Sequence, residues 1–327
     1  MSTTMFDGDQ PFGAGPPSGG GQAPTGEAPS LRPSSSRIGE RIILNLLFLA
    51  AVVSVLTTIA IVVSLLIPAF EFFREVSIVD FVTGTRWTPN FAVKDYGVLP
   101  LVVGTLWTTG IALLVAVPLG LGAAMLLSEY ASDRLRRVLK PVLEVLAGVP
   151  SVVYGFFALQ FIGPVLLSGV FGVELGTFNV LQAGLVLGIM IVPTVASLSE
   201  DAMSAVPSAL RQGSAALGAN RMQTTLKVIF PAAISGIIAA IVLGISRAVG
   251  ETMIVAIASG SIAQVIADPR QAAQTMTGFI AQAATGENAV GSLAYNTLYA
   301  VGLTLFVITL VVNIISIRLV RRYREAY

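Results

Sequence analysis

Two charged residues lie inside a long apolar stretch of this chain, and they are the residues best placed to do chemistry. Arg247 and Glu251 fall within residues 241–258, IVLGISRAVGETMIVAIA, which carry no other charge. An arginine at the centre of a bilayer costs about 2.5–3.5 kcal/mol on insertion scales, so such a residue marks a functional pathway by default. A guanidinium can bind two oxygens of a compact oxyanion at once. The stretch predicts a place where an anion passes, with a purely structural ion pair as the alternative.

The spacing of the two charged residues predicts that they pair. On one helix running from about Ala233 to Gly260, residues four apart share a face. Arg247 would lie about 20 Å from either end of that helix at 1.5 Å per residue, too far for its side chain to reach water. We expect the carboxylate of Glu251 to neutralise Arg247 whenever no anion is bound, so that no bare charge is buried.

Four hydroxyl-bearing residues are weaker candidates for the same path. Ser246 and Thr252 flank the charged pair, and Ser151 and Tyr154 follow a Gly-Val-Pro break at 148–150. Hydroxyl side chains within helices commonly bond to their own backbone instead. Packing and backbone capping are therefore open alternatives for all four.

The composition places these residues in a membrane. Of the 327 residues, 54% are hydrophobic and 11% are charged, against about 25% charged in soluble domains, and the mean hydropathy is +0.83. The chain has no cysteine and no histidine, which excludes thiol and imidazole catalysis and Cys/His metal sites. No G-x-x-x-x-G-K-[ST] loop is present, so we expect this chain not to bind a nucleotide as a P-loop would. We also expect no metal and no other cofactor on this chain. The net charge of +1 gives no sign of nucleic-acid binding, and no enzymatic residue set is evident.

Six apolar stretches are long enough to cross a bilayer, which predicts an all-α integral membrane protein. Gly148 and Pro150 interrupt the third stretch and predict a kink that protein or a cavity must cover. Residues 1–37 are rich in Gly, Pro and Ser without periodicity and predict a disordered tail, followed by a membrane domain over residues 38–327. The predicted spans are 42–70, 99–127, 142–171, 180–198, 233–260 and 293–317, joined by polar segments at 71–98, 128–141, 200–231 and 261–292.

The distribution of basic residues predicts the orientation. Fourteen of the 19 Lys and Arg residues lie before the first span at residues 1–41, in residues 128–141 and 200–231, and after the last span, while four lie in the other connections. Short cytoplasmic segments carry the excess of Lys and Arg. We expect both termini in the cytoplasm.

Residues 200–231 predict a jointed pair of helices on the cytoplasmic side. Pro207 suits the first turn of a helix, and Leu210, Ser214 and Leu217 would form its modest apolar face. Gly218, with Asn220, would end that helix in left-handed geometry. Taken alone, the segment also fits an amphipathic helix at the membrane surface.

This segment resembles the signature loop of bacterial ABC importer permeases, in which an E-A-A triplet precedes a glycine and an I-x-L-P end. Gln212-Gly213-Ser214 stand at the triplet, Gly218 matches the glycine, and Pro231 closes the pattern. The resemblance implies a coupling helix within about residues 204–219 that docks on a separate ATPase subunit. The residues that it assigns to coupling are Leu210, Gln212, Gly213, Ser214, Gly218 and Pro231.

Three further stretches are similar to phosphate-specific ABC transporter permeases of the PstC type: RAVGETM at 247–253, DFVTGTRWTPN at 80–90, and LAGVPSVVYGF at 146–156. The resemblance implies a type I ABC importer permease with its core at about residues 100–317, in a bacterial cytoplasmic membrane. It further implies phosphate import with a PstA-type permease chain, a PstB-type ATPase dimer holding ATP-Mg, and a PstS-type binding protein. The alternatives are an ABC permease for another oxyanion, and an ion-coupled carrier or channel that uses the Arg–Glu pair to move protons.

Overall fold

The computed structural model describes residues 38–286 and 288–322, and regular structure in this part is helical apart from one antiparallel bridge between Trp87 and Tyr96. The predicted tail at 1–37 lies outside the described residues. The longer helices are α1 (Ile38–Glu75), α3 (Leu99–Met125), α4 (Asp133–Ala147), α6 (Val180–Ser204), α10 (Ile234–Val249) and α13 (Leu293–Arg322). The short helices are α2 (Ile78–Thr83), α5 (Ser151–Phe157), α7 (Ser208–Ala216), α8 (Arg221–Thr224), α9 (Phe230–Ala232), α11 (Met253–Ala258) and α12 (Met276–Thr285). Three segments are π-helical, namely η1 (Leu126–Tyr130), η2 (Ala158–Val170) and η3 (Thr225–Ile229).

The chain divides within α1 into two units, residues 1–56 and 57–327. The described part of the first unit is the beginning of α1, whose large apolar side chains are mostly exposed, as expected of a helix that faces lipid. The second unit contains every other helix and both of the candidate sites.

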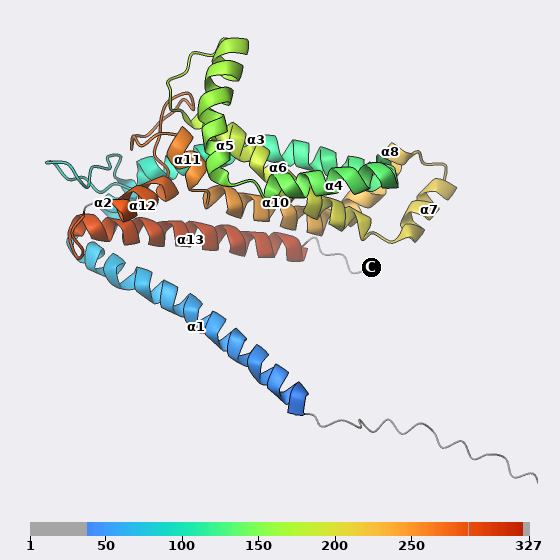
Figure 1. The fold of residues 1–327 in the computed structure, drawn as a ribbon, viewed down its shortest axis with the longest axis horizontal. Coiled ribbons are helices and arrows are strands. Elements are labelled where there is room, and N and C mark those ends of the chain that lie inside the picture. The colour runs from blue at the N-terminus through green and yellow to red at the C-terminus, as the bar shows by residue number, and fades with distance from the viewer. Residues whose placement is uncertain (1–37, 287, 323–327) are drawn as a thin grey trace, which may run out of the picture. The chain divides into compact units, whose positions relative to one another are not determined.

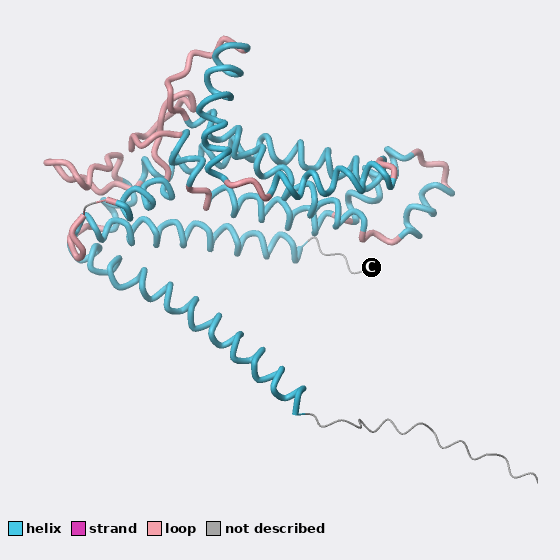
Figure 2. The backbone as a smooth tube through the Cα atoms, in the orientation of Figure 1, coloured by secondary structure: helices cyan, strands magenta, loops and turns pink. Residues whose placement is uncertain are grey.

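The described residues contain five or six candidate spans, against the six predicted from the sequence. Among the described residues, five helical stretches are long and apolar enough to cross a membrane, and there are six if the pair 221–232 and 234–249, bent by 73°, is counted as one span. Within the second unit, α3, α6, α10 and α13 run alongside one another (Figures 1 and 2). The short helix α7 lies at one end of this bundle, and α2 and α12 lie at the other, so we refer to the α7 end and the α12 end.

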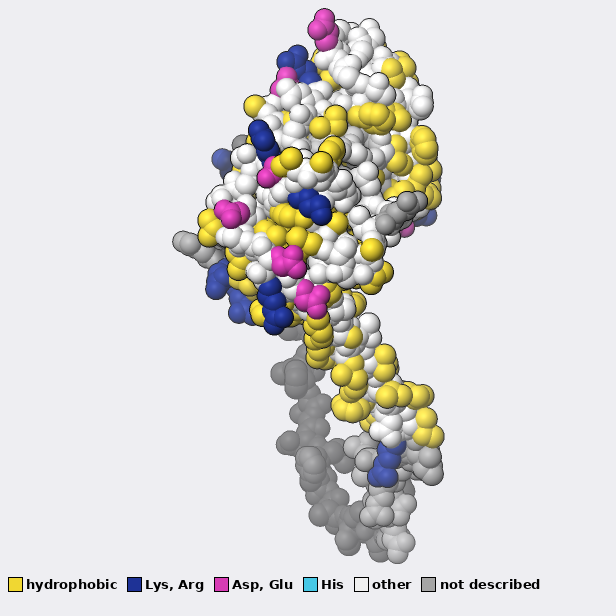
Figure 3. All heavy atoms as spheres, turned by 90° about the vertical axis from the view of Figure 1, so that its left-hand side faces the viewer, with side chains coloured by type: hydrophobic (Ala, Val, Ile, Leu, Met, Phe, Trp, Pro, Cys, Tyr) yellow, Lys and Arg dark blue, Asp and Glu magenta, His cyan; other side chains and the backbone are white. Residues whose placement is uncertain are grey.

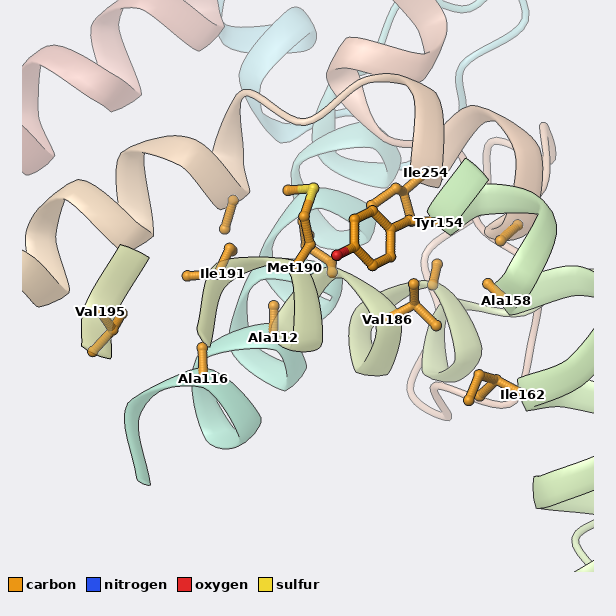
Figure 4. Packing of buried hydrophobic residues seen from close by; sticks show 14 of the residues in the cluster. Ala112, Ala116, Tyr154, Ala158, Ile162, Val186, Met190, Ile191, Val195 and Ile254 are labelled. Atoms are coloured by element: carbon orange, nitrogen blue, oxygen red, sulfur yellow. The ribbon is translucent and has the colours of Figure 1, made fainter. Parts of the chain in front are cut away.

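Helices α3 and α6 approach each other closely because glycines stand where they cross. A Cβ atom added at Gly188 of α6 would lie 2.8 Å from the carbonyl oxygen of Ala112, and one added at Gly184 would lie 2.7 Å from Cβ of Ile111. Small residues at four-residue spacing let helix backbones pack together in a membrane. The main core cluster is centred on this contact, and Figure 4 shows Ala112 beside Met190 and Ile191 of α6.

The third span begins later than predicted. Residues 133–147 form the separate helix α4, which carries four basic residues in its first half, and the membrane-spanning stretch is Ser151–Val170, formed by α5 and η2. The predicted break at 148–150 is present, but it precedes the span instead of interrupting it. Pro150 stands directly before α5, where a missing N–H costs no helical hydrogen bond, so a new helix starts there in a new direction (Figure 1).

The predicted polar loop at 261–292 contains a helix, α12, whose first turn is capped by Thr275 through a 3.1 Å hydrogen bond from the backbone N–H of Gly278. The α12 end also buries Trp87, which is 4% exposed and lies edge-on to Phe279 with ring centroids 5.0 Å apart. Figure 3 looks onto this end and shows acidic and basic side chains scattered among apolar ones.

Candidate functional site

The charged stretch is a broken helix, and the prediction of one helix from Ala233 to Gly260 is wrong. Helix α10 ends at Val249 and α11 begins at Met253. The carboxylate of Glu251 accepts hydrogen bonds from the backbone N–H groups of Met253, at 2.9 Å, and of Ile254, at 3.2 Å. In a continuous helix these two groups would bond to carbonyls four residues earlier. The Glu251 side chain satisfies them instead, which starts a new helix.

The predicted ion pair between Arg247 and Glu251 does not form in this structure. Among the described residues, the one hydrogen bond of the Arg247 side chain runs from Nη1 to Oγ1 of Thr194 on α6, at 3.0 Å. Arg247 lies in the last turn of α10, where the helix dipole favours a positive charge. Arg247 is thus stabilised by the C-terminal end of α10, and Glu251 by the N-terminal end of α11, instead of by each other.

Close packing between α10 and α6 brings Arg247 to Thr194. One turn before the arginine, a Cβ atom added at Gly244 would lie 3.2–3.3 Å from side-chain atoms of Val195 and Ile191 of α6. Thr194 is not among the residues predicted from the sequence to line the path. The neighbouring Pro193 could have pointed to it, because a proline within a span leaves one backbone carbonyl without its helical partner.

The residues around the break are tied to two other helices. Ser246 donates a hydrogen bond to Oδ1 of Asn313 on α13, at 3.2 Å. Thr277 of α12 donates to the backbone oxygen of Glu251, at 2.6 Å, and Thr252 bonds within the break to the carbonyl of Gly250, at 3.3 Å. The break therefore has defined neighbours on α6, α12 and α13.

Ser151 and Tyr154 form no hydrogen bond with the described residues of this group, although the Tyr154 ring packs against Ile254. Ser151 is the first residue of α5, and Tyr154 donates its hydroxyl to the carbonyl oxygen of Leu146 over 2.9 Å. The Tyr154 ring is buried against the core, near Ile254 and Met190 in Figure 4. The hydrogen bond of Tyr154 thus bridges the break at 148–150, which corresponds to the backbone-capping alternative.

The guanidinium at the break retains the capacity to bind an anion. It carries five N–H donors, and a single one forms a hydrogen bond among the described residues. The residue is half-buried, so its charge is less screened than at an exposed surface. The geometry therefore suits weak, reversible binding of an oxyanion.

A second candidate site lies at the α7 end. Helix α7 begins directly after Pro207, and Gly218 has φ +81°, so both predicted helix boundaries are confirmed. The predicted apolar face is wrong at Leu217, which is 90% exposed, and Asn220 caps α8, not α7, through a 2.9 Å hydrogen bond from the N–H of Gln223.

Helix α7 has an inner and an outer face. On the inner face, Leu210 packs into an apolar cluster with Met203 and Ile229, and the Ser214 hydroxyl lies 2.9 Å from that of Thr224. The outer face is exposed and carries small or uncharged residues, namely Gln212, Gly213, Ala215 and Ala216. Gly218, which follows α7, and Pro231, which lies in α9, are both exposed.

An ionic cluster joins α4 to the end of α6 beside this site. The Glu200 side chain is fully buried and forms ion pairs with Arg136 and Lys140, and Lys140 also contacts Asp201 at 2.8 Å. Hydrogen bonds to the carboxylates of Asp201 and Glu200 raise the pKa of Lys140 above its ordinary value. Arg136 and Lys140, which fall in the predicted polar segment at 128–141, are therefore part of a contact between two helices.

Comparison with known proteins gives one consistent family. The family description "binding-protein-dependent transport system inner membrane component" matches residues 116–325. The probable ABC transporter permease protein YqgH of Bacillus subtilis is 38% identical over 262 residues, covering 79% of this chain and 84% of its own length. The phosphate transport system permease protein PstC 1 of Mycobacterium tuberculosis is 36% identical over 278 residues, covering 74% of this chain and 81% of its own. A bacterial ABC transporter involved in the import of the acidic polysaccharide alginate has a similar fold, with a TM-score of 0.60 at 15% identity, covering 89% of this chain and all of that one.

Proposed function

The chain belongs to the family of binding-protein-dependent transport system inner membrane components, and on that premise we propose that it is the permease subunit of an ATP-driven importer of inorganic phosphate. The relatives named for phosphate transport support the substrate. The observation that carries the proposal is Arg247, a half-buried guanidinium at a helix break whose one hydrogen bond within the described residues is to Thr194.

In this proposal phosphate passes Arg247 and is released again. The guanidinium binds two phosphate oxygens through donors that Thr194 does not occupy. Ser246 and Thr252 line the same depth, while Glu251 holds the start of α11 through its two backbone hydrogen bonds. Midplane binding must be weak for transport to continue, and a single arginine with one supporting hydroxyl meets that requirement.

The energy for transport comes from a separate ATPase dimer that binds ATP-Mg. That dimer docks on the outer face of α7, with Gln212 and Gly213 at the contact and Leu210 and Ser214 holding the helix from inside. Both Gly218 and Pro231 follow α7: Gly218 ends this helix, and Pro231 lies in α9, directly before α10. The α7 end and both termini then lie in the cytoplasm, which agrees with the excess of Lys and Arg on that side.

A PstA-type permease chain and a PstS-type phosphate-binding protein complete the proposed complex in the bacterial cytoplasmic membrane. The second permease chain closes the other wall of the path beside Arg247. The binding protein delivers phosphate to the α12 end, since this is the end opposite to the ATPase contact.

The test is uptake of labelled phosphate by the complete complex in proteoliposomes. We expect Arg247→Lys to impair uptake severely although it keeps the charge, because an ammonium cannot bind two oxygens in one plane. A near-normal rate for this variant would reject the proposed role. Uptake that needs ATP separates an importer from an ion-coupled carrier, and competition by sulfate or molybdate separates phosphate from other oxyanions.

Arg247→Ala separates transport from structure. A complex that assembles normally but does not take up phosphate supports a role in the path. Failure of the variant to assemble with its partner subunits would assign Arg247 to helix packing instead.

A further inference from the structure

Arg211 of α7 forms hydrogen bonds with three residues outside its own helix. Arg211 donates from Nη2 to the Glu129 carboxylate at 2.9 Å and to the Met203 carbonyl at 2.8 Å, and from Nη1 to the Val206 carbonyl at 2.5 Å. Its Nε lies 3.3 Å from the same oxygen of Glu129. Charge-assisted hydrogen bonds of this kind are about twice as strong as neutral ones.

These bonds join three elements. Glu129 belongs to η1, which continues α3, and its side chain is 12% exposed. The Met203 carbonyl lies in the last turn of α6, where it also accepts a 3.3 Å bond from the backbone N–H of Val206. The Val206 carbonyl lies in the link from α6 to α7. Arg211 therefore fastens α7 to the ends of both α3 and α6.

The two fastened helices lead to the anion site. Helices α3 and α6 are packed together along their length, with Gly184 and Gly188 at the contact, so their ends move together. Thr194, which holds Arg247, lies on α6 nine residues before Met203, a distance of about 14 Å along the helix at 1.5 Å per residue. A continuous helix transmits a displacement over that length.

We propose that Arg211 is the mechanical joint through which a displacement of α7 reaches the α3–α6 pair and hence Arg247. The inference rests on the proposed function, in which an ATPase dimer pushes α7. Arg211 acts through other residues and is a positioning residue, since its side chain faces inward and its bonds end on this chain.

The experiment measures phosphate transported per ATP hydrolysed by the reconstituted complex. Arg211→Gln removes the charge and most of the donors, and we expect the complex to assemble and hydrolyse ATP while the ratio falls about tenfold. Arg221→Gln is the matched control, because Arg221 lies in the same segment, is exposed, and makes no side-chain hydrogen bond or ion pair within residues 38–286 and 288–322. The control should keep the wild-type ratio.

Glu129→Gln tests the joint from its other side and leaves α7 unchanged. We expect a smaller fall in the ratio, and the double variant with Arg211→Gln should be no worse than Arg211→Gln alone, because both changes break one link. An unchanged ratio in Arg211→Gln, or losses that simply add, overturns the proposal. So does a complex that no longer binds the ATPase, which would assign Arg211 to docking.

These outcomes differ from a failure of the proposed function. If the wild-type complex transports no phosphate, the function is wrong whatever Arg211 does. If wild type transports phosphate and Arg211→Gln keeps its ratio, the function stands and the joint does not.

Discussion

Oγ1 of Thr194 lies 3.0 Å from Nη1 of Arg247, and this bond links α6 to the last turn of α10. It orients the one guanidinium placed inside the predicted fifth span, and it leaves the other N–H groups directed elsewhere. Thr194 is thus the residue through which α6 sets the direction of the charge.

Thr194→Val removes the acceptor and keeps the shape of the side chain. A hydrogen bond to a charged group is worth about 1.5–3 kcal/mol, so we expect phosphate uptake to fall by about tenfold or more. Thr194→Ser keeps the hydroxyl and should restore most of the rate. Initial uptake rates over a range of phosphate concentrations check this, and equal losses in both variants would point to packing instead.

Glu251→Ala removes the acceptor of two backbone N–H groups at the start of α11. Loss of a helix cap costs about 0.5–2 kcal/mol, so the variant should unfold at a lower temperature in detergent. Glu251→Gln retains an oxygen that can accept these bonds and should be closer to wild type in both stability and uptake. If Glu251→Gln loses uptake as completely as Arg247→Ala, the negative charge itself is required, and the capping role is insufficient.

Gly188→Ala should weaken the α3–α6 contact, because the new Cβ would lie 2.8 Å from the carbonyl oxygen of Ala112. Overpacking of this kind costs about 1–3 kcal/mol. Gly110→Ala is the control, since a Cβ there has no neighbour within 4 Å. Thermal unfolding of the two purified variants checks the difference, and equal midpoints would show that the helices can separate without cost.

Lys140 predicts an effect of alkaline pH on the contact between α4 and α6. Hydrogen bonds to Asp201 and Glu200 raise its pKa above the ordinary value of 10.5. A raised pKa in the folded state means that the stabilisation is complete below pH 10.5 and is lost as the pH rises through the folded value. Lys140→Met should lower the unfolding temperature at pH 8 and reduce its further fall above pH 10.5. Parallel pH profiles for wild type and variant would contradict this.

The periodic and compositional features of the fold could be predicted from the sequence. Five of the six apolar stretches predicted from the sequence correspond to single candidate spans, and the remaining one corresponds in part to a bent pair of helices. Pro207 and Gly218 marked the two ends of α7, because their backbone preferences act locally. The end of α10 could not be predicted in this way. Residues 241–258 have no proline, and the helix ends because the Glu251 side chain competes with the backbone for two N–H groups.

The hydrogen-bond partners of the charged residues could not be predicted from the sequence either. Spacing of four residues suggested that Arg247 pairs with Glu251, but that inference requires one uninterrupted helix. The actual partner, Thr194, is 53 residues away and becomes a neighbour through the packing of α10 on α6. The role of Arg211 could not be predicted either. The signature pattern of the permease loop concerns neighbouring residues such as Leu210 and Gln212, and it gives no information on hydrogen bonds between Arg211 and other helices.

The gap between Val249 and Met253 makes α10 and α11 two separate rods instead of one. The regular ladder of helical hydrogen bonds is interrupted at residues 250–252, so it does not carry a displacement of α10 into α11. Between the two rods, Thr277 of α12 holds the backbone oxygen of Glu251. Arg247 lies in the last turn before this interruption, so a shift of α10 against α11 would change what its side chain can reach without unwinding either helix.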